Sequence, residues 1–205
     1  MGGYTRRYRT GGINNMEPIK FYSTKGTYGC LSNFSRHGFS TASEDGVELW
    51  WKTSEHFFQA AKFFTTDREY AEEIRLAKTP KEAATLGRGR SKPLRNDWEE
   101  IKDDVMLYAL LCKFNNNDDA HSVLLGTGDE QLIEDAPYDS YWGIGSAQGG
   151  KGKNMLGILL CETRSILRHC LPEDVDECRD PACYSLHYTE FRQKCSELWD
   201  RIVGK

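Results

Sequence analysis

The segment 52–64, with the sequence KTSEHFFQAAKFF, constrains the fold of this chain more than any other stretch. Thr53 or Ser54 can accept a hydrogen bond from the first free backbone N–H groups of a helix, so the segment predicts a helix that begins here. Most of one side of this helix is apolar and consists of Phe57, Phe58, Ala60, Ala61 and Phe64. A helix with so many large apolar side chains requires a core to pack against.

The other side of this helix carries a polar stripe. At about 100° per residue, Glu55, Gln59 and Lys62 fall nearly in line. An acid, an amide and an amine in a row can form the floor of a polar pocket. A solvated helix face with one charge pair explains the same periodicity, because charged stripes usually face water. The periodicity alone leaves both interpretations open.

Composition excludes several classes of protein. A hydrophobic content of 39% and an aromatic content of 12% are typical of a globular chain. The net charge of −4 excludes a protein that is basic throughout and coats nucleic acid. No stretch reaches the roughly 20 apolar residues of a membrane span, and the first residues show no secretory signal. Together with seven cysteines, an odd number, this favours reduced thiols and a cytoplasmic or nuclear location.

The rest of the chain predicts short strands and several helices in one domain with an appendage. A strand is expected at 19–22 and a hairpin within 39–51. Further helices are predicted at 67–77, 79–87, 97–114 (from Asn96 or Asp97), 121–125, 155–170 and 184–203. We therefore divide the chain into a flexible basic arm (1–18), one domain (19–171) and a C-terminal extension (172–205) with an amphipathic helix.

Three carboxylates are candidates for chemistry. Asp139 precedes Trp142 by three residues inside a tight turn, and a tryptophan beside glycines can stack on a base or a sugar. A hydrophobic plug that closes the core is the alternative for this tryptophan. Glu55, Glu134 and Asp139 would suffice for acid–base work on a glycosidic bond if the fold brought them together.

Two basic segments are candidates for binding an anion. The glycine-rich stretch 149–154 supplies Lys151 and Lys153 just before a predicted helix, whose free N–H groups favour phosphate. It lacks the lysine–hydroxyl ending of a Walker loop, which excludes that class of nucleotide triphosphatase. The loop 87–95 carries Arg88 and Arg90, which suit a phosphate or a nucleic-acid backbone. A flexible connection and solvated surface charge are the respective alternatives.

Many stretches together resemble the NADAR (YbiA-like) family. In order along the chain they are Phe21-Tyr22, Leu31-Ser-Asn33-Phe34, the segment 53–63, the segment 87–95, Trp98, Lys102, Met106, Lys113-Phe114, Tyr141-Trp142-Gly143 and Gly152-Lys153-Asn154-Met155-Leu-Gly157. The match covers roughly residues 19–169 in the order and spacing of the family. The basic arm and the extension lie outside it.

The resemblance implies a mainly helical α+β domain that hydrolyses N-glycosidic bonds without a cofactor or a metal. It implies Glu55 as the leading acid or base and Asp139 as ribose binder or charge stabiliser. Lys62 either orients Glu55 or forms a Schiff base with a ring-opened sugar. The positions expected to bind substrate are Tyr22, Asn33, Phe34, Arg88, Arg90, Trp98, Glu134, Trp142, Gly143, Lys151, Lys153 and Asn154.

Two substrate classes are associated with the family, and both join ribose C1′ to an exocyclic amine. We expect removal of ADP-ribose from guanine in DNA or RNA, because a basic arm and a basic loop suit nucleic acid. Phosphoribosylamino-pyrimidine intermediates of riboflavin synthesis are the alternative substrate. A non-catalytic module that binds ADP-ribose is the alternative of another class. No membrane partner is expected.

Overall fold

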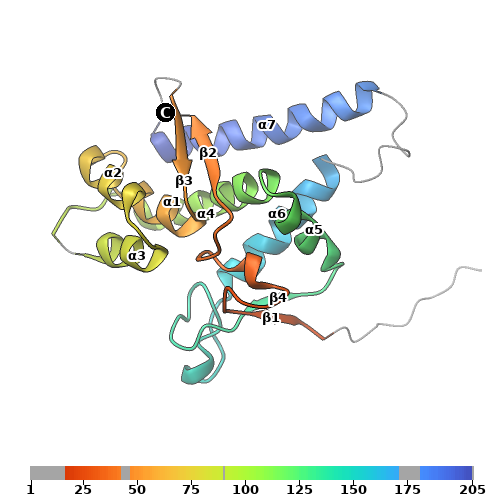
Figure 1. Ribbon diagram of the computed structural model, residues 1–205, viewed down its shortest axis with the longest axis horizontal. Coiled ribbons are helices and arrows are strands. Elements are labelled where there is room, and N and C mark those ends of the chain that lie inside the picture. The colour runs from red at the N-terminus through yellow and green to blue at the C-terminus, as the bar shows by residue number, and fades with distance from the viewer. Residues whose placement is uncertain (1–16, 43–46, 90, 171–180, 205) are drawn as a thin grey trace, which may run out of the picture.

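The computed structural model describes residues 17–42, 47–89, 91–170 and 181–204. It has the expected mainly helical α+β fold with short strands (Figure 1). The strands are β1 (Ile19–Phe21), β2 (Phe39–Ala42), β3 (Glu48–Trp51) and β4 (Leu132–Glu134). The helices are α1 (Ser54–Ala61), α2 (Arg68–Leu76), α3 (Pro80–Arg88), α4 (Trp98–Asn115), α5 (Asp118–Gly126), α6 (Met155–Cys170) and α7 (Pro181–Val203), with short 3-10 turns η1 (Gly29–Leu31) and η2 (Ser146–Gln148).

The strands form two separate pairs. β2 and β3 are the expected antiparallel hairpin, in which Phe39 pairs with Trp51. β1 and β4 are parallel, so Phe21 lies beside Glu134 although 113 positions separate them in sequence. This second pair brings the segment after β1 and the segment after β4 to the same side of the molecule.

Helix α1 begins where the sequence predicts, because the side chain of Thr53 accepts a hydrogen bond from the backbone N–H of His56. All eight residues of α1 are buried. The helix contacts α2, α3 and α4 and follows directly from β3, so it has no solvated face. The ring of Phe57 packs edge-on against Trp51 at 5.0 Å, which anchors the apolar side of α1 in the core.

Side-chain caps also start α2 and α3, within the predicted ranges. Asp67 accepts from the N–H of Tyr70, and Thr79 accepts from the N–H of Glu82. Helix α5 begins three residues before the predicted start at His121. Its first turn contains Asp118 and Asp119, two acidic residues that favour a helix N-terminus.

The helix of the C-terminal extension packs on the domain. Phe191, Leu198 and Ile202 of α7 are buried against α4 and α6, and Figure 1 shows α7 lying across both helices. Arg201 adds an ion pair of 2.6 Å with Asp104 of α4. Among the described residues, no helix is long and apolar enough to cross a membrane.

Candidate active site

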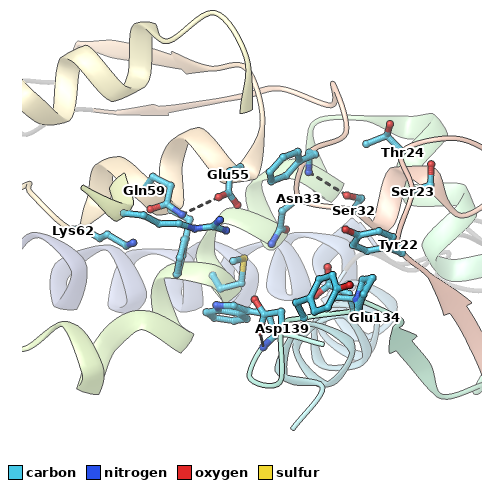
Figure 2. Close-up of a pocket in the computed structure, with 18 residues that line it drawn as sticks. Tyr22, Ser23, Thr24, Ser32, Asn33, Glu55, Gln59, Lys62, Glu134 and Asp139 are labelled. Carbon is cyan, nitrogen blue, oxygen red and sulfur yellow. Dashed lines mark hydrogen bonds between the residues drawn. The ribbon is translucent and has the colours of Figure 1, made fainter. Parts of the chain in front are cut away.

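One cavity of about 710 Å³ opens among α1, α3, α4 and the segments that follow β1, η1 and β4. The predicted site residues that line it are Tyr22, Asn33, Phe34, Glu55, Lys62, Arg88, Glu134, Asp139 and Trp142. Figure 2 shows that Glu55 of α1 and Lys62, the C-terminal cap of α1, face Glu134 and Asp139 across this space. Glu55 and Asp139 therefore open onto one cavity, as the family resemblance leads us to expect.

The α1 wall of the cavity is the polar stripe. Glu55, Gln59 and Lys62 are only 6%, 3% and 9% exposed, so the stripe is not a solvated helix face. Gln59 Nε2 donates a hydrogen bond of 2.8 Å to Glu55 Oε1. Lys62 Nζ donates one of 3.0 Å to the carbonyl of Gly87 at the end of α3. One hydrogen bond therefore joins two residues of the stripe, and another joins the stripe to α3.

A second wall follows η1. The carbonyl of Asn33 accepts a 3.2 Å hydrogen bond from the backbone N–H of Glu55, which docks this loop on the first turn of α1. Below it, the fully buried Lys113 of α4 donates a 3.0 Å hydrogen bond to the carbonyl of Ser32. Burial lowers the pKa of Lys113 to about 7. The loop that presents Asn33 and Phe34 is therefore held from two helices.

The third wall is the turn from Asp139 to Trp142. One carboxylate oxygen of Asp139 accepts N–H hydrogen bonds from Tyr141 (2.9 Å) and Trp142 (2.8 Å), which closes the predicted tight turn. The Tyr141 hydroxyl donates to Asp103 of α4. Trp142 lines the cavity and also packs edge-on against Phe58 at 5.1 Å. Its ring therefore closes the core and faces the cavity at once.

The carboxyl groups of the cavity differ in electrostatic surroundings. Burial is the main cause that raises the pKa of Glu55, while the Gln59 hydrogen bond and the charges of Arg88 and Lys62 lower it. Burial, together with the smaller contributions of the nearby charges of Asp139 and Glu55, raises the pKa of Glu134 to about 8. At neutral pH Glu134 is a carboxylic acid that can donate a proton into the cavity.

Other predicted site residues lie outside the cavity lining. Trp98 is buried behind the wall, where its ring packs on Phe58 at 5.0 Å and under the Lys62 ammonium at 5.5 Å. Gly143 is buried so closely that an added Cβ would lie 2.7 Å from the carbonyl oxygen of Glu134. Arg90 lies outside the described residues, as do residues 1–16 of the basic arm.

The glycine-rich stretch before α6 serves the fold. The side chain of Asn154, whose φ is +55°, accepts from the N–H of Glu134 and donates to the carbonyl of Leu132, both at 2.8 Å. The backbone N–H groups of 152–156 bond to carbonyls of 140–144, so these donors at the start of α6 are already paired. Lys151 is exposed, and Lys153 lies over the Tyr141 ring at 4.8 Å.

Several residues of the cavity were not predicted as site residues, although Ser32 and Met106 belong to the motifs that carry the family resemblance: Ser23, Thr24, Ser32, Met106, Ala136, Pro137 and Tyr138. Ser23, Thr24 and Ser32 follow β1 or η1, and Ala136, Pro137 and Tyr138 precede Asp139. Only their closeness in sequence to predicted site residues could have indicated that they line the cavity. Phe58 was expected on the buried side of α1, yet its ring forms part of the wall, because neighbours surround α1 on all sides. Within the described part of the chain, no group of three or more His, Cys, Asp or Glu side chains could hold a metal ion.

Comparisons with known proteins identify the family of this chain. Residues 20–168 match the NADAR domain family. The chain is 47% identical over 149 residues to the N-glycosidase YbiA of Escherichia coli K12, covering 73% of this chain and 88% of that protein. It is 42% identical over 154 residues to the N-glycosidase Npun_R5314 of Nostoc punctiforme, covering 75% of this chain and 94% of that protein.

A longer relative and a solved structure are also similar to this chain. The chloroplastic riboflavin biosynthesis protein PYRR of Zea mays is 40% identical over 166 residues, which cover 77% of this chain but only 26% of that longer protein. The NMR structure of Escherichia coli YbiA superposes with a TM-score of 0.63 at 47% identity, covering 73% of this chain and 83% of that chain. The chain therefore belongs to the NADAR family and is similar over most of its length to YbiA-type N-glycosidases.

Proposed function

We propose that this chain is an N-glycosidase that hydrolyses the bond between ribose C1′ and an exocyclic amine. We further propose that its substrate is ADP-ribose attached to guanine in nucleic acid, and that removal restores the base. The observation that carries the proposal is the convergence of Glu55, Glu134 and Asp139 on one cavity. The N-glycosidase relatives support the reaction type.

The proposed reaction needs a proton at the leaving group. An exocyclic amine leaves poorly until its nitrogen or its ring is protonated, so a general acid accelerates the step. Glu134 is protonated at neutral pH and can supply this proton. Glu55 acts as the acid–base partner and in its ionised form takes a proton from the attacking water. The C1′–N bond breaks, the nitrogen gains the proton of Glu134, and the water oxygen joins C1′.

Positive charge develops on the sugar as this bond breaks. A carboxylate beside C1′ stabilises that charge, and Asp139 is held rigidly enough by its turn to do so. In a second route, the ring oxygen leaves C1′ and takes a proton, so that C1′ and the exocyclic nitrogen form an imine. The uncharged amine of Lys62 adds to C1′, the exocyclic amine leaves with a proton, and water then hydrolyses the resulting lysine imine. In the resting structure Lys62 donates to the Gly87 carbonyl, so this route requires the lysine to release that contact.

The remaining cavity residues suit the rest of the ligand. Tyr22, Phe34 and Trp142 present aromatic rings to the cavity, which favours stacking on a base. Arg88 offers a cation for a diphosphate. The volume of about 710 Å³ falls in the range of pockets that hold ligands the size of a nucleotide derivative.

Phosphoribosylamino-pyrimidine intermediates are the second candidate substrates. The relative from Zea mays carries a riboflavin biosynthesis name, and such an intermediate shares the ribose–amine bond of the first candidate. A panel of N-ribosides separates the candidates: ADP-ribosyl-guanosine in DNA and in RNA, the free nucleoside, and the aminopyrimidine intermediate. We expect mass spectrometry to show release of ADP-ribose with restored guanine. Cleavage of the aminopyrimidine alone would contradict the proposed substrate.

A module that binds ADP-ribose without cleaving it is the alternative outside the enzymes. The Glu55→Ala variant tests it when binding and turnover are both measured. Loss of turnover with binding retained supports the enzyme. If the wild-type protein binds ADP-ribose but turns over no N-riboside in the panel, the proposal that this chain is an enzyme is contradicted.

A further inference from the structure

Gln59 contacts Glu55 inside the cavity and lies one helical turn after it on α1 (Figure 2). Its Nε2 is the donor in the 2.8 Å hydrogen bond to Glu55 Oε1. Both side chains are almost completely enclosed, and burial deprives a carboxylate of the water that would otherwise donate to it. The amide of Gln59 takes the place of that water.

The end of α3 is shaped to hold Gln59. A Cβ added at Gly87 would lie 2.2 Å from Gln59 Oε1 and 2.7 Å from Gln59 Cβ, so any larger residue would displace this side chain. Gln59 Oε1 is buried and has no hydrogen bond partner in the described part of the chain. The amide is therefore held by its contact with Gly87 and by its single hydrogen bond to Glu55.

We propose that Gln59 is a positioning residue, which holds Glu55 as an oriented carboxylate, and that glycine is required at position 87 to admit it. The inference rests on the proposed N-glycosidase function and deepens it. A donated hydrogen bond stabilises the ionised form of a carboxyl group and lowers its pKa, as Gln59 does for Glu55. The charged groups that act on the Glu55 carboxyl are Arg88 of α3, Lys62 at the C-terminal cap of α1 and Asp139 of the turn after β4. Glu134 of β4 faces the same cavity.

The first test replaces Gln59 by methionine, which keeps an unbranched chain of similar length but cannot donate. We expect kcat to fall about tenfold with KM within about twofold, because a reacting group loses its orientation. The acidic limb of the pH profile of kcat/KM should move to higher pH, since the pKa of Glu55 rises without the donor. A purely structural role would lower the rate equally at every pH.

Helix α7 offers a matched control. Gln193 Nε2 donates 3.0 Å to Glu197 Oε1, an amide–carboxylate pair with the same four-residue spacing on an exposed helix face. Gln193→Met should leave both the rate and the acidic limb unchanged. A shift of equal size in this control would overturn the inference.

A second variant, Gly87→Ala in α3, perturbs the hydrogen bond between Gln59 and Glu55 without changing either residue. Gly87→Ala favours the helix by propensity, so any loss arises from displaced side chains. The acidic limb should move in the same direction as in Gln59→Met, and this variant decides the question if Gln59→Met does not fold. A folded variant of either kind with the wild-type acidic limb would overturn the inference.

The Glu55 titration can also be followed without turnover, by ¹³C NMR of the carboxyl carbon in the resting protein. We expect Gln59→Met or Gly87→Ala to move this titration to higher pH. An unshifted titration would overturn the inference. A shifted titration in a protein whose wild type cleaves no N-riboside would uphold the Gln59–Glu55 coupling and overturn only the proposed function.

Discussion

The two glutamates of the cavity lie in contrasting surroundings. Glu55 is in the first turn of α1, where the helix N-terminus favours negative charge, and Gln59 donates a hydrogen bond to it. Glu134 lies on a strand, and its carboxyl accepts no hydrogen bond from the described residues. The charges that act on Glu134, those of Asp139 and Glu55, are both negative, and they raise its pKa.

The difference teaches how one cavity can hold both an acid and a base at the same pH. The two glutamates start from the same ordinary pKa, and burial, almost complete for Glu55 and partial for Glu134, raises both pKa values. Asp139 raises the pKa of both, but Gln59, Arg88 and Lys62 lower that of Glu55, whereas Glu55 raises that of Glu134 further. Neighbouring groups, and not residue type, therefore separate the two pKa values, and the proposed mechanism uses this by giving the base role to Glu55 and the acid role to Glu134.

The largest effect is expected from Glu55→Gln. This variant keeps the size of the side chain but can neither take up nor release a proton, so we expect kcat to fall about 1,000-fold with little change in affinity for ADP-ribose. Turnover and equilibrium binding measure the two effects. The same substitution at Glu48, an exposed residue of β3, is the control. A loss of less than tenfold at Glu55 would contradict the acid–base role.

Glu134→Gln should cost about 100-fold in kcat on a substrate with an exocyclic amine leaving group, because the proton donor is lost. On an N-riboside whose leaving group departs without protonation, most of this loss should disappear. Glu55→Gln should stay slow on both substrates, because water still needs a base. Equal losses in Glu134→Gln on the two substrates would remove the distinction between the glutamates.

The raised pKa of Glu134 also predicts how stability depends on pH. A carboxyl whose pKa rises on folding from 4.5 to about 8 contributes stability below pH 4.5 that is lost as the pH rises to about 8. Between pH 5 and pH 9 the wild type should lose about 2 kcal/mol relative to Glu134→Gln, less than the full shift implies because the carboxyl borders the solvent of the cavity. Urea unfolding at both pH values measures this, and parallel pH dependence in the two proteins would contradict it.

Asp139→Asn changes the charge beside Glu134 with little change in shape. The amide oxygen can still accept from the N–H groups of Tyr141 and Trp142, so the turn is preserved. Loss of the negative charge lowers the pKa of Glu134, so the alkaline limb of kcat/KM should move to lower pH. An alkaline limb that stays in place would show that another group produces it.

Arg88→Met should weaken binding of a diphosphate substrate, and its effect on the titration of Glu55 is the smallest that we expect. Arg88 lines the cavity but is exposed, and its charge lowers the pKa of Glu55 from a distance. Its loss should move the acidic limb slightly to higher pH in dilute buffer. Concentrated salt should abolish the difference between variant and wild type, because it screens exposed charges. A difference that persists in about 1 M salt would contradict this exposed, long-range action.

Local signals predicted much of the fold. Thr53, Asp67 and Thr79 each start a helix by the hydrogen bond that their residue type suggests. The β2–β3 hairpin was predictable because its partners are close in sequence. The parallel pairing of β1 with β4 was not, because nothing local indicates which distant strand is the partner. That pairing is what places Glu134 in the cavity.

The candidate site was predictable only in part, for a similar reason. Periodicity aligned Glu55 with Lys62, and the motif matches indicated that this stripe faces a pocket with Asp139 and Trp142. The raised pKa of Glu134 depends on which groups converge there, which no spacing reveals. The glycine-rich stretch before α6 suggested an anion site, but distant carbonyls occupy its N–H groups.

The central claim is that the neighbours of the two glutamates keep the pKa of Glu134 above that of Glu55. A ¹³C NMR titration of glutamate side-chain carboxyls tests it most directly, with the two resonances identified by their absence in Glu55→Gln and Glu134→Gln. We expect the Glu134 carboxyl to titrate at about pH 8 and above Glu55. Titration of Glu134 at or below the pH at which Glu55 titrates would contradict the claim.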